Sequence, residues 1–207
     1  MQTVLFQGDS ITDADRSRDW DARRGIGYPH LISAQLGYDA PGQYRLVNRG
    51  VSGDRVVDLY ARIKRDCINL KPDFMSILIG VNDVWHEIGD QNGVDTDKYE
   101  RVYGMYIEEI REQVPDVKIM ILEPFLTHGA ATDPHWDYFS TEVAERAAAA
   151  KRVAQKYGLT FVPLQARFDA ACEKQPPEYW TDDGVHPTAF GHELISRAWL
   201  EAFETIR

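Results

Sequence analysis

The sequence predicts an α/β protein in three layers, a doubly wound sheet of five parallel strands with helices on both faces. Short apolar runs alternate with longer segments in which apolar residues recur at helical spacing, and this alternation is typical of a parallel sheet. We expect residues 1–207 to form a single domain, because 207 residues can bury one full core and no repeat or linker divides them.

Five apolar runs are short enough to be strands, and turn residues or helical segments separate them. They cover residues 3–7, 45–48, 74–79, 118–122 and 160–162. Each run is followed by a segment with helical periodicity, so the strands should pair in parallel, in the order found in flavodoxin.

Three segments show the i, i+3, i+4, i+7 spacing of a helix with one buried face. Two of them run from Tyr99 to Ile110 and from Phe139 to Tyr157. The third should begin after Pro187, with Thr188 as its N-cap.

The composition excludes several classes of partner. A net charge of −10 disfavours nucleic acids and anionic membranes, whose phosphates would be repelled, and it is compatible with a neutral ester substrate. No apolar run is long enough to cross a membrane, and the first residues lack the basic leader of a signal peptide. The sequence leaves a homo-oligomer open.

The two cysteines, Cys67 and Cys172, form neither a disulfide framework nor a metal-binding pattern. Cys67 shares an apolar helical stripe with Leu59 and Ile63, which predicts a buried thiol. A reducing, cytoplasmic location follows as an expectation.

Ligands of open parallel sheets bind where the strands end, so the loops after each strand are the places to search. The first reads Gly8-Asp9-Ser10. Glycine lets the chain turn sharply, and the serine hydroxyl can then stand at the sheet edge, although the same residues are common in ordinary turns. Asp9, Asp13 and Asp15 are expected to form a solvated acidic loop, not a metal site.

Two further strand-end loops offer hydrogen-bond donors. Gly53 lies between the second strand and a helix, where its backbone N–H can stabilise developing negative charge. Asn82 follows the third strand and can donate through its side-chain amide. The alternatives are a glycine that only permits a turn and an asparagine that only caps a helix.

Asp183 and His186 lie three residues apart, so one turn can bring them together. A carboxylate on one imidazole nitrogen fixes the tautomer, and the other nitrogen can then accept a serine proton. The alternative is a lone surface histidine. The remaining histidines are expected to be structural or at the surface: His30, His86, His128, His135 and His192. Of these, His128 and His135 could line a pocket.

These four blocks, in this order, resemble the SGNH hydrolase family, also called GDSL esterases, over nearly the whole chain. The resemblance implies that Ser10 is the nucleophile, His186 the general base and acid, and Asp183 its support. It also implies an oxyanion hole formed by the backbone N–H groups of Ser10 and Gly53 and the amide of Asn82. Neither a metal nor an organic cofactor is implied.

Within the family the chain is most similar to bacterial acetylxylan esterases and other carbohydrate deacetylases, in the stretches Asn48-Arg49-Gly50-Val51-Ser52-Gly53 and Ile79-Gly80-Val81-Asn82-Asp83-Val84-Trp85. Trp85, Trp136 and Trp180 fall in or beside strand-end loops, so we expect them to contact a sugar; the alternative is that they cover the core. The expected substrate is therefore an acetylated sugar such as a xylo-oligosaccharide.

Two rival functions remain open at this stage. One is another acyl-ester hydrolase, such as a lysophospholipase or thioesterase with a longer acyl pocket. The other is a non-enzymatic relative that only binds carbohydrate, for which a lost Ser, Asp or His would be the expected mark; Ser10, Asp183 and His186 are all present.

Overall fold

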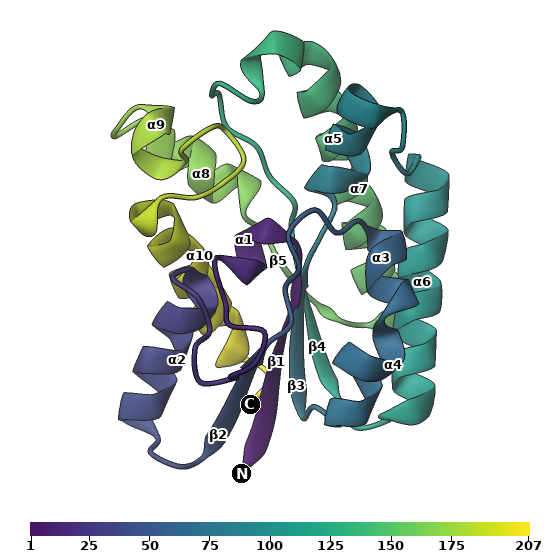
Figure 1. Cartoon of the computed structure of the whole chain (residues 1–207), viewed down its shortest axis with the longest axis vertical. Coiled ribbons are helices and arrows are strands. Elements are labelled where there is room, and N and C mark those ends of the chain that lie inside the picture. Colours follow the sequence, from purple (N-terminus) through teal and green to yellow (C-terminus); the bar gives the residue numbers. More distant parts are fainter.

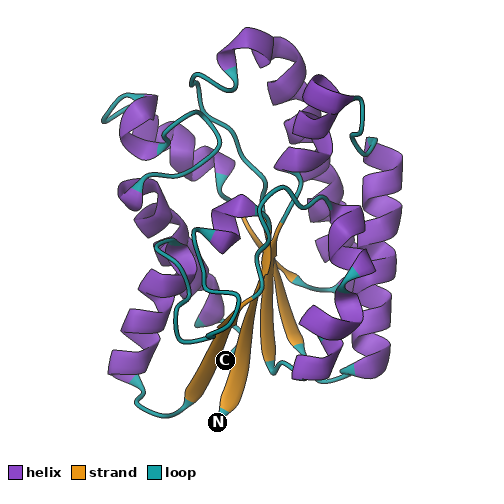
Figure 2. Ribbon diagram, in the orientation of Figure 1, coloured by secondary structure: helices purple, strands orange, loops and turns teal.

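The computed structural model describes residues 1–207, and it shows helices packed on both faces of one five-stranded sheet (Figures 1 and 2). All four strand pairs are parallel, and the strand order is β2-β1-β3-β4-β5. The predicted three-layer, doubly wound architecture with the order found in flavodoxin is therefore confirmed.

The strands are β1 (Gln2–Gly8), β2 (Tyr44–Asn48), β3 (Phe74–Leu78), β4 (Lys118–Leu122) and β5 (Thr160–Val162). The longer helices are α2 (Tyr28–Asp39), α5 (Val81–Asp90), α6 (Thr96–Gln113), α7 (Trp136–Tyr157), α8 (Gln165–Cys172) and α10 (Ala189–Phe203). The short ones are α1 (Ser10–Asp13), α3 (Val56–Ala61), α4 (Ile63–Asp66) and α9 (Pro177–Trp180), with 3-10 turns η1 (Ile68–Leu70) and η2 (Asp133–His135).

Every predicted strand is present, and each predicted boundary lies within one residue of the observed one. The two apolar stripes fall in α6 and α7 as expected. The Thr188 hydroxyl caps α10 by accepting a hydrogen bond from the backbone N–H of Gly191 at 3.4 Å, which confirms the predicted N-cap.

The segment that follows β3 and contains Asn82, predicted above as a strand-end loop, begins instead with a helix. The chain turns at Gly80, with φ of +140°, and enters α5 at once. Val81, Val84 and Ile88 all pack on the core, so a helical stripe was present in the sequence. The early start of α5 matters because it holds Asn82 in its first turn.

The core has two halves, one on each face of the sheet. On one face α2 and α10 cover the strands (Figure 1), and Phe6 and Trp199 are in contact at 5.4 Å between ring centroids. On the other face lie α3, α6 and part of α7. Burial of each aliphatic or aromatic side chain stabilises the folded state by about 1.5–3 kcal/mol. The packing of these layers fixes the positions of the strand ends.

The Cys67 side chain is fully buried, and its Sγ lies 3.6 Å from the Sδ of Met75, which confirms the predicted buried thiol.

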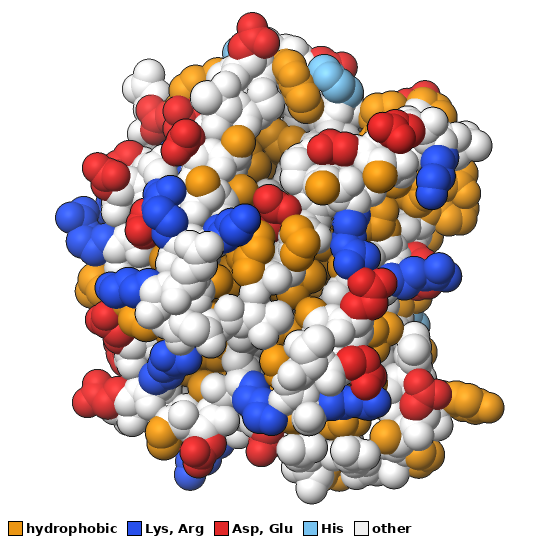
Figure 3. Space-filling model, turned by 180° about the vertical axis from the view of Figure 1, so that it is seen from behind, with side chains coloured by type: hydrophobic (Ala, Val, Ile, Leu, Met, Phe, Trp, Pro, Cys, Tyr) orange, Lys and Arg blue, Asp and Glu red, His pale blue; other side chains and the backbone are white.

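Acidic and basic side chains are interspersed over the face opposite to that of Figure 1 (Figure 3). None of the helices combines the length and the apolar character that a membrane crossing requires.

Candidate active site

Ser10 lies at the carboxyl end of β1, which is flanked by β2 and β3 in the sheet, and it is the first residue of α1. Asp9 caps this short helix, since its Oδ1 accepts a hydrogen bond from the N–H of Ile11 at 3.0 Å. A Cβ atom at Gly8 would lie 2.4 Å from the carbonyl oxygen of Leu78. Only glycine therefore lets β1 turn here without pushing β3 away, and this turn presents the Ser10 hydroxyl at the sheet edge.

A hydrogen-bonded chain joins three side chains at this edge. Ser10 Oγ lies 2.8 Å from His186 Nε2, and His186 Nδ1 lies 2.7 Å from Asp183 Oδ2. The other carboxylate oxygen of Asp183 accepts hydrogen bonds from the N–H groups of Val185 (2.9 Å) and His186 (2.8 Å). The carboxylate is thus fixed by the backbone and holds the imidazole with Nε2 toward the serine.

The loop that carries Asp183 and His186 is closed by its own hydrogen bonds. The N–H of Asp182 donates to the carbonyl oxygen of His186 at 2.8 Å, and Thr181 forms an antiparallel bridge with Pro187. Gly184 adopts φ of +100°, and a Cβ there would lie 2.7 Å from the carbonyl oxygen of Thr127. This close approach anchors the loop on the segment that follows β4.

The hydrogen bonds set the charges of the pair. Burial raises the pKa of Asp183, but the hydrogen bonds from the His186 ring and backbone and from the Val185 N–H outweigh it and lower that pKa to about 2. The hydrogen bond to Asp183 is the largest influence on His186 and raises its pKa above 6.5, against the effect of burial. A carboxylate therefore faces an imidazole whose basicity it increases.

Three hydrogen-bond donors lie in the turns beside Ser10. The backbone N–H groups of Ser10 and Gly53 donate to no protein acceptor, and Gly53 adopts φ of +85°. The Asn82 amide donates one hydrogen bond to the carbonyl oxygen of Asp54 at 3.1 Å, which leaves its second N–H free. These are the three groups predicted for an oxyanion hole.

Hydrogen bonds also tie the three turns together. The N–H of Val51 donates to the carbonyl oxygen of Gly8 at 3.0 Å, so the loop of Gly53 is bound to the serine turn. The buried carboxylate of Asp83, next to Asn82, accepts the N–H of Val56 at 3.1 Å and so binds α5 to the start of α3. The donors are held in place before any ligand arrives.

The prediction of a solvated acidic loop is wrong for Asp9 and Asp13. Both side chains are buried, and only Asp15 is exposed. Burial raises the pKa of Asp9 to about 7, and Asp13 pairs with Arg18 and with the Ser52 N–H. In the sequence all three aspartates look like polar loop residues. In the structure, neighbouring segments of the chain cover Asp9 and Asp13.

A pocket of about 450 Å³ opens beside Ser10 and His186. Its wall combines the apolar side chains of Ile11 and Ile26 with the polar side chains of Asp15 and Asp182. His192, predicted above to be structural or at the surface, also lines it. One signal was available, because His192 lies in the first turns of the helix that follows His186.

The three predicted substrate-binding tryptophans lie in different places. The Trp85 ring is half-buried, with its centroid 5.8 Å from that of His186. Trp136 stacks on His128 at 3.7 Å and lines a separate pocket with Pro124 and Gln165. The structure thus brings Trp85 to the Ser10–His186 pair and does not bring Trp136 into the pocket beside it.

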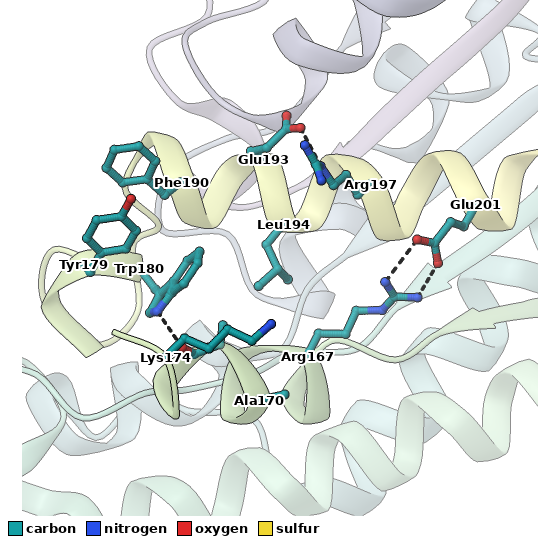
Figure 4. Close-up of a pocket in the computed structure, with 11 residues that line it drawn as sticks. Arg167, Ala170, Lys174, Tyr179, Trp180, Phe190, Glu193, Leu194, Arg197 and Glu201 are labelled. Atoms are coloured by element: carbon teal, nitrogen blue, oxygen red, sulfur yellow. Dashed lines mark hydrogen bonds and ion pairs between the residues drawn. The ribbon is translucent and has the colours of Figure 1, made fainter. Parts of the chain in front are cut away.

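Trp180 lies farther from the pair, in a pocket between α8 and α10 (Figure 4). Its indole N–H donates to the carbonyl oxygens of Ala171 (3.0 Å) and Gln175 (3.2 Å). Tyr179 packs on its edge and stacks on Phe190, as Figure 4 shows. Trp180 thus lines the pocket between α8 and α10 and is not among the residues that line the pocket containing Ser10.

Comparison with known proteins agrees with this geometry. The model of the GDSL-like lipase/acylhydrolase family matches residues 6–194. An acetylxylan esterase from Geobacillus stearothermophilus is 33% identical over 218 residues, which cover all of this chain and 96% of that protein.

Solved structures show the same relationship. A Parabacteroides merdae protein described as a GDSL-like lipase superposes with a TM-score of 0.92 at 35% identity, covering 98% of this chain and 95% of the other. The structure of an acetylxylan esterase from Geobacillus stearothermophilus gives a TM-score of 0.86 at 32% identity, covering 97% and 93%. The family match, the full-length relative and these structures show that the chain belongs to the GDSL-like lipase/acylhydrolase family.

Proposed function

We propose that this chain is a serine esterase in which Ser10 is the nucleophile, His186 the general base and then the general acid, and Asp183 the group that orients the imidazole. The hydrogen-bonded chain Ser10–His186–Asp183 is the observation that carries this proposal. Family membership and the likeness to an acetylxylan esterase support an ester hydrolase.

The reaction proceeds in two halves. The Ser10 hydroxyl gives its proton to His186 Nε2 while its oxygen bonds to the ester carbonyl carbon. The carbonyl oxygen becomes negatively charged and accepts hydrogen bonds from the Ser10 and Gly53 N–H groups and the Asn82 amide. His186 then protonates the leaving alcohol, and an acyl-serine remains. Water, deprotonated by His186, then attacks the acyl carbon. His186 returns this proton to the Ser10 oxygen as the acyl–oxygen bond breaks, which releases the acid and restores the Ser10 hydroxyl.

We further propose that the acyl group is acetyl and that the alcohol is a sugar, with xylo-oligosaccharides as the first candidates. Support comes from the full-length likeness to an acetylxylan esterase and from the Trp85 ring beside His186, since indole faces suit sugar rings. The pocket beside Ser10 is also lined by carboxylates, which favour hydroxyl groups over a fatty chain.

The test is acetate release from acetylated xylo-oligosaccharides by the wild type and by Ser10→Ala. The variant should lose on the order of 10³-fold or more in kcat, because nothing replaces the nucleophile. Its thermal unfolding should stay close to that of the wild type, since a half-buried hydroxyl is removed. Near-normal turnover by Ser10→Ala would contradict the mechanism, and hydrolysis of simple acetates without release from any sugar would contradict the substrate alone.

A further inference from the structure

His192 is buried, with only 7% of its surface exposed, and its tautomer is fixed by the backbone. Nδ1 lies 3.2 Å from the backbone nitrogen of Tyr28, whose N–H can only donate. Nδ1 is therefore the acceptor, and the proton of the neutral ring is on Nε2. Burial lowers the pKa of His192 to about 4, so the ring is neutral at neutral pH.

The Nε2–H group of this ring has no protein acceptor. Nδ1 makes the one hydrogen bond of the side chain, and Nε2 is not among the polar atoms that are sealed inside the protein. The part of His192 that remains accessible lines the pocket beside Ser10 and His186. A buried, uncharged donor thus points its free N–H at the space next to the nucleophile.

The ring is held rigidly in this orientation. A Cβ at Gly27 would lie 2.8 Å from Cε1 and 3.1 Å from Nδ1 of His192, so the imidazole rests directly on the Gly27 backbone. The backbone N–H of His192 donates to the carbonyl oxygen of Thr188 at 2.9 Å, which fixes the backbone that carries the ring in the first turn of α10. A donor whose ring is held by the Tyr28 N–H and the Gly27 backbone loses little freedom when it binds an oxygen.

The pocket lies on the side of the site where the alcohol must be. His186 lines it and has to protonate the leaving oxygen, whereas Gly53 and Asn82, which face the carbonyl oxygen, do not line it. Asp15 and Asp182 supply acceptors for hydroxyl groups, and Ile26 supplies an apolar surface. We infer that this pocket binds the alcohol part of the ester as a polyhydroxylated ring, with His192 Nε2–H as the donor to one of its oxygens.

This inference rests on the proposed esterase function and makes His192 a residue that determines alcohol specificity. The test compares an acetylated methyl xyloside with cyclohexyl acetate, which has a ring of the same size but no further hydroxyl. In His192→Asn the side-chain oxygen can still accept the Tyr28 N–H, but no N–H reaches the position of Nε2. The ratio of kcat/KM for the sugar acetate to that for cyclohexyl acetate should fall about tenfold, the effect of one hydrogen bond.

The ratio does not depend on how much of a variant is folded, so reduced stability of His192→Asn cannot imitate the effect. His30→Asn, the same substitution at an exposed histidine of α2, should leave the ratio at the wild-type value. An unchanged ratio in His192→Asn would overturn the inference and leave the esterase function standing. A wild type that hydrolyses neither ester would overturn the esterase function itself, and the inference with it.

Discussion

Asp13 accepts hydrogen bonds from both the backbone N–H (3.0 Å) and the hydroxyl (3.1 Å) of Ser52. This contact joins the helix that begins at Ser10 to the loop that contains Gly53. The carbonyl oxygen of Gly50 is bound in the same way, by Arg16 at 2.7 Å and by Arg18 at 3.0 Å. The position of the Gly53 N–H relative to the nucleophile is therefore set by contacts outside the hydrogen-bonded chain Ser10–His186–Asp183.

Asp13→Ala should consequently lower kcat by about ten- to a hundredfold, with a smaller change in KM, because small displacements of a transition-state donor are costly. Asp13→Asn keeps an acceptor oxygen and should recover part of the loss. Steady-state kinetics on a short acetate ester give both constants. Asp19→Ala, at an exposed acid of the same loop, is the control. A loss in Asp13→Ala that appears in KM alone would assign Asp13 to substrate binding.

The pH profile should report the His186–Asp183 pair. His186 must be neutral to accept the serine proton, so kcat/KM should fall as the pH drops through its pKa. Asp183 raises that pKa, and the acid limb of the wild type should therefore lie above the reference value of about 6.5. In Asp183→Asn the limb should move to lower pH while kcat falls, because the neutral amide no longer supports the imidazolium.

The matched variant for this profile is His192→Asn, because the imidazole that it removes is already neutral over the same pH range, burial having lowered its pKa to about 4. Its acid limb should coincide with that of the wild type. If Asp183→Asn left the limb in place, the titrating group would not be His186.

Asn82→Ala should lower kcat by roughly 10²–10³-fold, because its free amide N–H acts on the charge that develops in the transition state. The same variant also loses the hydrogen bond to the Asp54 carbonyl oxygen at 3.1 Å, so its unfolding should be measured alongside. Asn82→Asp keeps the size but replaces the donor by a carboxylate and should be at least as inactive. A raised KM with normal kcat would place Asn82 in substrate binding instead.

Much of this site follows from local sequence. The strands, the serine turn and the three-residue spacing of Asp183 and His186 are set by apolar periodicity, glycine and one turn of chain, all of which can be read from neighbouring residues. What the sequence could not predict depends on tertiary packing. Asp13 looks like a loop residue until Arg18 and Ser52 close over it, and the indole of Trp180 is positioned by the carbonyl oxygens of Ala171 and Gln175. His192 gains its role only because α2 lies against α10 and offers it a backbone N–H.

The acyl chain is the part of the substrate for which the structure supports the sharpest prediction. In a lipase, each further CH₂ that enters an apolar channel contributes about 0.8 kcal/mol, so activity rises from acetate toward octanoate. Here the pocket that contains Ser10 is the one assigned above to the alcohol, and it offers a long acyl chain no apolar channel. A fatty chain that entered it would displace the alcohol and leave the polar side chains of Asp15, Asp182 and His192 without partners. We therefore expect kcat/KM on p-nitrophenyl esters to be highest for acetate and to fall steeply toward octanoate. A maximum at octanoate would contradict the acetyl preference and favour a lysophospholipase or thioesterase activity, with the Ser10–His186–Asp183 mechanism unchanged.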